Sequence, residues 1–260
     1  MIHLHTRSRY SLLEAVLDID DIIRLAKENH QTAVALTDHR SMFATMSFVH
    51  AAKEAGLKPI IGLEVETNWK NQPISFLLLA KNGQGLHSLY LLSTRLMSDS
   101  TPLELDDMKA YVDGCILMNA GGDDVFETLA HEPNEDLLDE LLDTLKSFVL
   151  DPDDLYIAMS IHDSPYFRQK DEQLKKRAQF KEIPTVALSR IEYEKPEDER
   201  TLRLLQAINQ QKVIDHPDIR VRSGRYWRTE DEMESLYDAD DLKATETIAA
   251  RIEDYRLPKA

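Results

Sequence analysis

Five histidine and glutamate residues stand at or just after short apolar segments of this chain, and their types suit metal binding. They are His5, Glu14, His39, Glu64 and His162. Imidazole and carboxylate groups are ligands for Zn, Mn or Fe, and two or three such ions can activate water and clamp a phosphate ester. If the fold brings the five side chains together, the pattern indicates a metal-dependent phosphate hydrolase.

Seven short apolar segments alternate with amphipathic ones, which predicts strands that alternate with helices. The strands are expected at residues 1–4, 32–36, 59–65, 74–80, 115–119, 155–160 and 185–188. This order favours a mostly parallel α/β sheet, either open and doubly wound or closed into a barrel. In both architectures functional side chains follow the C-terminal ends of strands, which is where the five candidates stand.

Capping residues mark several helix boundaries. Asp18 should cap a helix that runs to Asn29, and Ser41 should cap a second helix that Gly56 ends. After residue 212 the chain becomes loop-like and then predicts two short helices, at residues 230–237 and 240–254. We therefore expect a main α/β unit followed by a small helical segment that continues into a linker.

Composition excludes several classes of protein. The formal net charge is −16. Binding of nucleic acid through its phosphates requires clustered Lys and Arg, so this chain by itself should not bind nucleic acid in that way. A single cysteine, Cys115, cannot form an internal disulfide, as expected of a cytoplasmic protein. No apolar run approaches the roughly twenty residues of a membrane span. We expect a cytoplasmic protein that does not contact membranes.

Several longer stretches carry a resemblance to a known family. They are HLHTRSRYSLLEA, VALTDHRSMFATMSFVHAAKEAGLKPIIGLEVE, LLLAKNGQGLHSLYLLST, VALSRIEYEKPED, YWRTEDEMESL and ATETIAARIEDYRLP. The chain resembles the polymerase and histidinol phosphatase (PHP) family, and more narrowly the N-terminal PHP domain of bacterial DNA polymerase III alpha subunits of the Gram-positive type. The resemblance covers essentially all 260 residues.

The resemblance implies a distorted seven-stranded β/α (TIM-like) barrel at residues 1–212, with a helical appendage and linker at 213–260 leading to downstream polymerase domains. Some members of the family bind about three metal ions and act as phosphoesterases or proofreading 3′–5′ exonucleases. The nucleotidyltransferase activity of a DNA-directed DNA polymerase would lie downstream, so this chain alone should not polymerise DNA. Its implied partners are those downstream domains and other replisome subunits, with DNA bound only by the full-length protein.

The metal motif departs from the family pattern at three positions. The second histidine of the opening motif falls on Arg7, and the closing Asp-x-His motif reads Arg190-Ile191-Glu192. A guanidinium is permanently charged and cannot ligate a cation. Arg7 or Arg190 could instead pair with Glu14, Glu64 or Glu192, because buried carboxylates need positive charge nearby.

The leading hypothesis is therefore a degenerate site with a structural role and no metal bound at full occupancy. One alternative is a partial site that binds Zn or Mn through His5, Glu14, His39, Glu64 and His162 and keeps phosphoesterase or exonuclease activity. Another is a free-standing PHP phosphatase, such as a histidinol-phosphate phosphatase.

Overall fold

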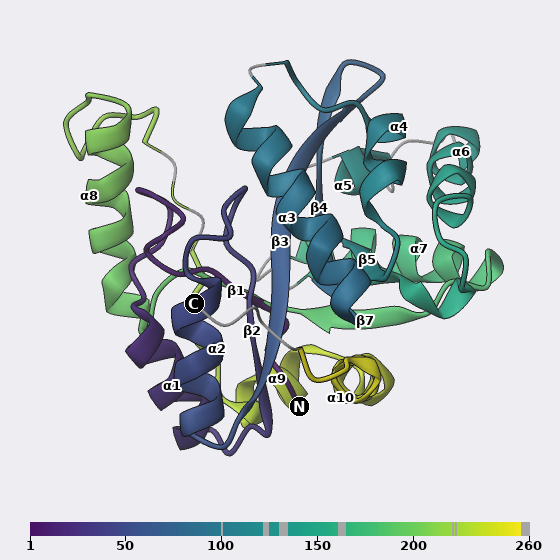
Figure 1. Cartoon of the computed structure of the whole chain (residues 1–260). Helices are drawn as coiled ribbons and strands as arrows, with labels where there is room; N and C mark the ends of the chain where they lie inside the picture. Colours follow the sequence, from purple (N-terminus) through teal and green to yellow (C-terminus); the bar gives the residue numbers. More distant parts are fainter. Residues whose placement is uncertain are drawn as a thin grey trace.

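The computed structural model describes residues 1–255 apart from 100, 122–124, 130–134, 161–164, 220 and 222. Six strands form one curled, half-barrel sheet in the order β2-β3-β4-β5-β6-β7, and two short strands, β1 and β8, pair separately (Figure 1). The strands are β1 (His5–Thr6), β2 (Ala33–Leu36), β3 (Lys58–Trp69), β4 (Gln72–Ala80), β5 (Cys115–Asn119), β6 (Leu155–Ser160), β7 (Thr185–Leu188) and β8 (Arg190–Ile191).

Helices cover the outside of this sheet, with α1 and α2 beside β2 and β3, and α3 across β3 and β4 (Figure 1). The helices are α1 (Ile19–Glu28), α2 (Thr45–Glu54), α3 (Gly83–Ser98), α4 (Leu105–Met108), α5 (Val125–Leu129), α6 (Glu135–Lys146), α7 (Pro165–Phe180), α8 (Glu199–Asn209), α9 (Glu230–Leu236) and α10 (Ala239–Arg251). Short 3₁₀ turns lie at Lys109–Tyr111, Pro152–Asp154 and Pro196–Asp198. One continuous apolar core joins the sheet to its helices.

The sheet is mixed, because β4 runs antiparallel to both β3 and β5 while the other neighbours are parallel. β3 extends to Trp69, four residues beyond the predicted strand, and turns back through Lys70 and Asn71, both with φ near +60°. Two consecutive left-handed residues fit the twist of a two-residue hairpin loop. This hairpin was not anticipated, since neither turn residue is glycine.

β1 and β8 lie next to the edge strands of the larger sheet. The amide of Thr37, just after β2, donates to the carbonyl of Thr6 at 2.9 Å. β8 follows β7 after a single residue and pairs in parallel with β1. The ends of β1, β2 and β8 therefore converge on one place, which is where the candidate residues stand.

One predicted strand and one predicted helix cap were wrong, whereas the predicted helix boundaries at Asp18 and Gly56 were confirmed. Residues 1–4 form no strand, because their amides bond side chains: that of Ile2 donates to the Thr245 hydroxyl at 3.0 Å. Ser41 does not cap α2, whose N-cap is Ala44, since the 41–44 segment turns before the helix begins. Asp18 caps α1 through a reciprocal capping box with Asp21, as the sequence predicts.

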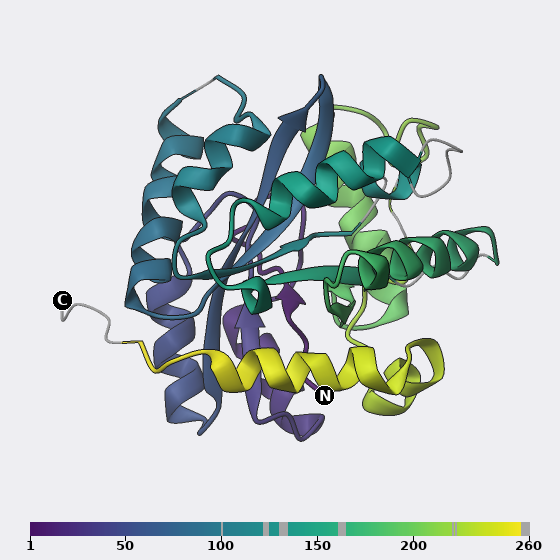
Figure 2. The same cartoon turned by 90° about the vertical axis from the view of Figure 1, so that its right-hand side faces the viewer.

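The segment after residue 238 closes the end of the sheet opposite the candidate residues, and α10 crosses that end in Figure 2. Its contacts fall at or directly before the first residues of strands: Lys58 Nζ, at the start of β3, donates to the Ala249 carbonyl at 2.7 Å, and Arg251 pairs at 2.7 Å with Asp154, the residue before β6. Ile248, Ile252 and Tyr255 belong to the main core. The helical segment at the C-terminal side thus shares one core with the sheet.

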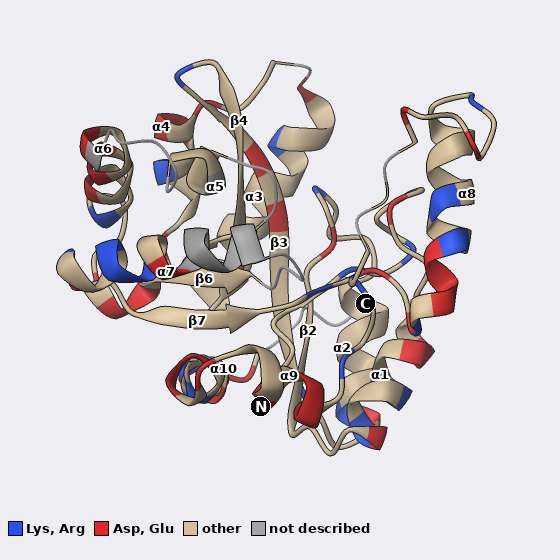
Figure 3. Ribbon diagram, turned by 180° about the vertical axis from the view of Figure 1, so that it is seen from behind, with Lys and Arg blue, Asp and Glu red and all other residues tan. Residues whose placement is uncertain are grey.

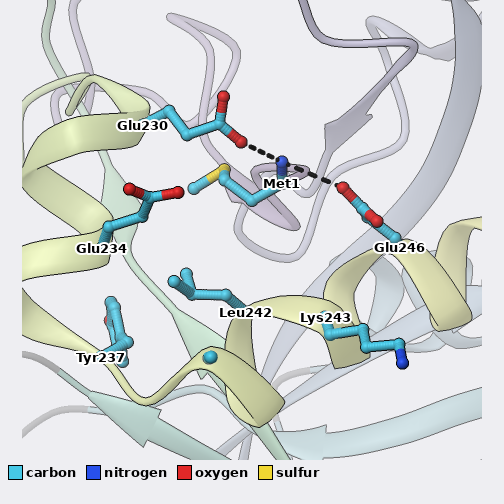
Figure 4. A pocket seen from close by; sticks show the side chains of 8 residues that line it. Met1, Glu230, Glu234, Tyr237, Leu242, Lys243 and Glu246 are labelled. Atoms are coloured by element: carbon cyan, nitrogen blue, oxygen red, sulfur yellow. Dashed lines mark hydrogen bonds and ion pairs between the residues drawn. The ribbon is translucent and has the colours of Figure 1, made fainter.

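The N-terminal residue packs on the same segment. The Met1 ammonium lies between Glu230 on α9, at 2.7 Å, and Glu246 on α10, at 3.2 Å (Figure 4). Burial lowers the pKa of this ammonium, but the two carboxylates outweigh it and the pKa lies above its usual value. Both glutamates are more than half exposed, so we expect these pairs to contribute little stability.

We expect Tyr255→Phe to lower the free energy of unfolding by about 1–3 kcal/mol, the cost of leaving buried polar groups unpaired. The Tyr255 hydroxyl donates to the Ala80 carbonyl at 2.6 Å and accepts from the Ile61 amide at 3.3 Å. Urea unfolding would measure the change. Tyr226→Phe is the matched control: its hydroxyl donates to the surface carboxylate of Glu232 at 2.7 Å, and an equal loss there would contradict a specific role for Tyr255.

Candidate functional site

Strand pairing brings the candidate residues of four segments together. His5 of β1 stands opposite Arg190 of β8, and His39, just after β2, forms a parallel bridge with Glu64 of β3. Arg7 follows β1 directly, and its amide donates to the Ile191 carbonyl at 2.9 Å. The ends of β1, β2 and β8 and the middle of β3 therefore define the candidate site.

Glu64 is the centre of the site, and its side chain is 2% exposed. Its Oε2 accepts from Arg7 Nε at 2.7 Å and from His5 Nε2 at 2.9 Å, and it lies 2.6 Å from Arg7 Nη2 as an ion pair. Its other oxygen, Oε1, accepts from Arg190 Nη2. Both carboxylate oxygens are thus occupied by positively charged or ring N–H donors.

Glu14 lies at the solvent side of the same cluster. Arg7 Nη1 donates to its Oε2 at 2.7 Å, so one guanidinium bridges Glu14 and Glu64. The His39 ring pairs with the same carboxylate, with Nδ1 at 2.9 Å from Oε2 and 3.1 Å from Oε1. Glu14 and His39, which were both predicted to bind metal, instead contact each other, and Glu14 also contacts Arg7.

Glu192 is held from the opposite side by a residue that sequence reasoning missed. Arg225 Nη1 donates to Glu192 Oε1 at 2.7 Å, while Arg7 and Arg190 lie 3.5 and 3.3 Å from the same oxygen. The contact spans 33 residues, and Arg225 stands in a segment of mixed charge with no motif around it. The three glutamates are therefore matched by three arginines.

Asp38 fixes the loop that carries these side chains. Its carboxylate accepts from the Ser8 amide at 2.7 Å, the Ser8 hydroxyl at 2.8 Å and the Ser11 hydroxyl at 2.7 Å. Ser11 Oγ in turn accepts from the His39 amide at 3.0 Å. These bonds position the loop between Arg7 and Glu14 against the end of β2.

The neighbouring positive charges set the charge states of Glu64 and Glu14. Burial alone raises the pKa of Glu64, but the charges of Arg7 and His5 outweigh it and hold that pKa far below its ordinary value. Burial likewise raises the pKa of Glu14, yet the His39 contact and the Arg7 charge leave it lowered. Burial lowers the pKa of Arg7, and the three carboxylates raise it above its usual value. Arg7, Glu14 and Glu64 are thus all charged at neutral pH.

Two other histidines complete the comparison with the sequence. His3 lies outside the site: its Nε2 is 2.9 Å from the Arg228 carbonyl, its ring packs edge-on against Trp227, and burial lowers its pKa to about 4. This agrees with the motif register, in which the second position falls on Arg7 and the first therefore on His5 rather than His3. His162 lies outside the described residues.

The side chains that the structure describes do not fit a multi-metal cluster. A ligand must offer an unoccupied lone pair to the cation, whereas the oxygens of Glu64 and Glu14 receive guanidinium and imidazole groups at 2.6–3.1 Å. Arg7 and Arg190 place permanent positive charge at the centre of the cluster. Among the described residues, no three His, Cys, Asp or Glu side chains are grouped so as to hold a metal ion.

The surface around the site has mixed charge. Lys and Arg are interspersed with Asp and Glu on α1 and α8 (Figure 3). Within the described part of the chain, no helix is both long and apolar enough to cross a lipid bilayer.

The family of this chain follows from its match to a family profile. The profile of the PHP domain matches residues 3–162, which is more than half of the chain. The chain therefore belongs to the PHP domain family. Two solved structures share its fold: a protein from Bifidobacterium adolescentis assigned as a metal-dependent phosphoesterase (12% identity, TM-score 0.55, covering 97% of this chain and 96% of that one), and an amidohydrolase from Chromobacterium violaceum (13%, TM-score 0.51, 74% and 87%).

Within that family, the chain is similar to the N-terminal region of DNA polymerase III subunit alpha. The subunit of Borreliella burgdorferi is 27% identical over 276 residues, which cover 98% of this chain and 24% of that protein. The subunit of Aquifex aeolicus is 26% identical over 233 residues, covering 82% and 20%. The chain thus spans about a quarter of the length of these curated relatives. The matches do not single out the Gram-positive type.

Proposed function

We propose that this chain is the N-terminal PHP domain of a replicative DNA polymerase III alpha subunit and serves there as a structural domain with a degenerate metal site. The single observation that carries the proposal is the guanidinium of Arg7, which bridges Glu14 and Glu64 at 2.6–2.7 Å. Arg190 and Arg225 extend the same pattern to Glu192. The arginines take the place that cations would take between these carboxylates.

The proposal includes the finer architecture of the family. β1 and the six-stranded sheet, with β8 taken as the continuation of β7 after one residue, would together form its distorted seven-stranded barrel, with residues 1–212 as the barrel and 213–260 as the segment leading to the polymerase domains. The bond from Thr37 to Thr6 and the pairing of β1 with β8 support this. The domain would stabilise the polymerase and contact its downstream domains and other replisome subunits.

Metal content tests the proposal directly. We expect protein purified without chelator and without a metal-affinity tag to hold less than about 0.1 Zn or Mn per chain by mass spectrometry. We also expect no hydrolysis of an aryl phosphate or of the 3′ end of DNA when Mn²⁺ is added. Near-stoichiometric metal, lost in a Glu64→Ala variant, would overturn the degenerate site.

A partial site that binds Zn or Mn is the second candidate. It is favoured by the two histidine–glutamate pairs, His5 with Glu64 and His39 with Glu14, whose types suit those ions. It would make the chain a metal-dependent phosphoesterase, 3′–5′ exonuclease or free-standing phosphatase. Phosphatase activity that requires Mn²⁺ and disappears in both Glu64→Ala and His39→Ala would establish it.

A further inference from the structure

An apolar groove lies between the start of α2 and the C-terminal half of α3. It encloses about 450 Å³ and is lined by Met42, Phe43, Tyr90, Thr94, Met97 and two serines, none of which carries a charge. Charged residues make up 30% of the whole chain, so a lining of seven uncharged residues is unusual for its surface. The lining of the groove therefore contains no charged side chain.

Large apolar side chains are exposed in and beside this groove. Phe43 is 66% exposed, Met97 55%, Leu91 51% and Met46 45%. Leu91 and Thr94 are three residues apart on α3, and Met46 lies in the first turn of α2, shortly after the lining residues Met42 and Phe43, so the exposed residues adjoin the groove lining. Contiguous apolar surface of this kind marks an interaction site more often than a solvated one. We refer to these four residues and the groove as the α2–α3 surface.

The groove is preformed, because polar bonds fix its floor. Ser93 Oγ donates to the Arg40 carbonyl at 2.9 Å, and Arg40 Nη2 donates to the Leu96 carbonyl at 2.9 Å. These bonds hold α3 against the segment that joins β2 to α2. A rigid groove of this kind loses little conformational entropy when a partner binds.

The course of the chain indicates what covers the surface. Relatives about four times longer match this chain at their N-terminal region, so most of their polypeptide follows it. The last described residue, Tyr255, lies beside α2: Lys53 Nζ donates to its carbonyl at 3.3 Å. Lys53 is near the C-terminal end of α2, a ten-residue helix about 15 Å long whose other end carries Phe43 and Met46. A connection of five or six extended residues spans about 17–20 Å.

We propose that the α2–α3 surface docks an amphipathic helix of the polypeptide that follows residue 260, and that this contact joins the domain to the rest of the subunit. Three methionines, Met42 and Met97 in the groove and Met46 beside it, give the α2–α3 surface an adaptable apolar character that suits the apolar face of a helix. Because the chain carries a net charge of −16, an uncharged patch selects an apolar partner over a charged one. The inference rests on the proposed function, since it requires the longer polypeptide.

Methionine oxidation tests the contact. Residues 1–260 and the intact natural polypeptide are treated with hydrogen peroxide, and oxidation of each methionine is followed by mass spectrometry. We expect Met46 and Met97 to oxidise at least about tenfold more slowly in the intact protein. Leu150→Met, introduced into both proteins, is the matched control: position 150 is 95% exposed and remote from the groove, so it should oxidise equally in both.

Three outcomes would overturn the proposal: equal rates for Met46 and Met97 in the two proteins, protection in residues 1–260 that grows with protein concentration, or a natural polypeptide that ends at Ala260. The second would assign the surface to another copy of this chain. Metal content measured on the same samples tests the degenerate site independently of the docking surface. Unprotected methionines in metal-free protein would refute only the docking surface, and stoichiometric metal would refute only the degenerate site.

Discussion

Replacing Arg7 by methionine should lower the free energy of unfolding by about 3–5 kcal/mol, the range found when one partner of a buried ion pair is removed. Arg7 is 4% exposed and contacts all three glutamates of the site. Methionine retains most of the apolar stem but removes the charge, so Glu64 remains buried with fewer donors. Urea unfolding of the variant and the parent protein at pH 7 would measure the loss.

Arg9→Met is the control for this prediction, since it removes the same group two residues away. Arg9 is 60% exposed and pairs with Asp18 at 2.9 Å, so its removal should cost less than about 1 kcal/mol. An equal decrease in the free energy of unfolding for the Arg7 and Arg9 variants would show that the buried cluster of arginines and glutamates contributes no more stability than a surface ion pair.

The cost of Arg7→Met should depend on pH in a defined direction. The pKa of Glu64 in the folded protein lies below its unfolded value of 4.5, so the stability gained from its ionisation is present above pH 4.5 and is lost as the pH falls towards the folded pKa. Without Arg7, the folded pKa of Glu64 rises and this contribution shrinks. The difference in stability between parent and variant should therefore be largest near neutral pH and decline below pH 4.5. A constant difference would contradict the assignment.

Local sequence signals predicted much of this fold. β5, β6 and β7 have the predicted bounds because each is a mostly apolar run between polar turns, and Asp18 and Gly56 mark helix ends by local chemistry. The strand at 74–80 was predicted, but its antiparallel direction was missed because the Lys70-Asn71 turn contains neither glycine nor proline. Residues 1–4 look like a strand by composition, yet their amides bond side chains brought from α10 and from Gln31, which no local pattern reveals.

The candidate site was only partly predictable for a similar reason. Motif register singled out Arg7 and Arg190 as substitutions and proposed that they pair with carboxylates, and the structure places both beside Glu64. Which glutamate each would contact depends on the register of β1 against β8, a long-range property. Arg225 approaches Glu192 only because the chain near residue 225 bonds back to it, with the Glu192 amide donating to the Arg225 carbonyl at 2.8 Å.

Restoring the family pattern should create a metal site. The triple variant Arg7→His, Arg190→Asp and Glu192→His removes two positive charges, adds one negative charge and removes another, so the net charge of the cluster falls by two. The oxygens of Glu64 and Glu14 lose their guanidinium donors and become available beside His5 and His39. We expect the variant to bind about one Zn or Mn per chain after dialysis against the metal, where the parent binds less than about 0.1.

A triple variant at exposed positions provides the control for this gain. Arg9→His, Arg200→Asp and Glu197→His make the same changes of residue type and of net charge on the surface, so they should leave metal content at the parent level. Metal bound by the site variant should also raise its unfolding midpoint in proportion to metal concentration, because the ion binds only the folded state. The single variant Arg7→His, which disturbs fewer contacts, should show a weaker gain in the same direction. A folded site variant that binds no more metal than the surface control would show that the arginines are not what excludes the cations.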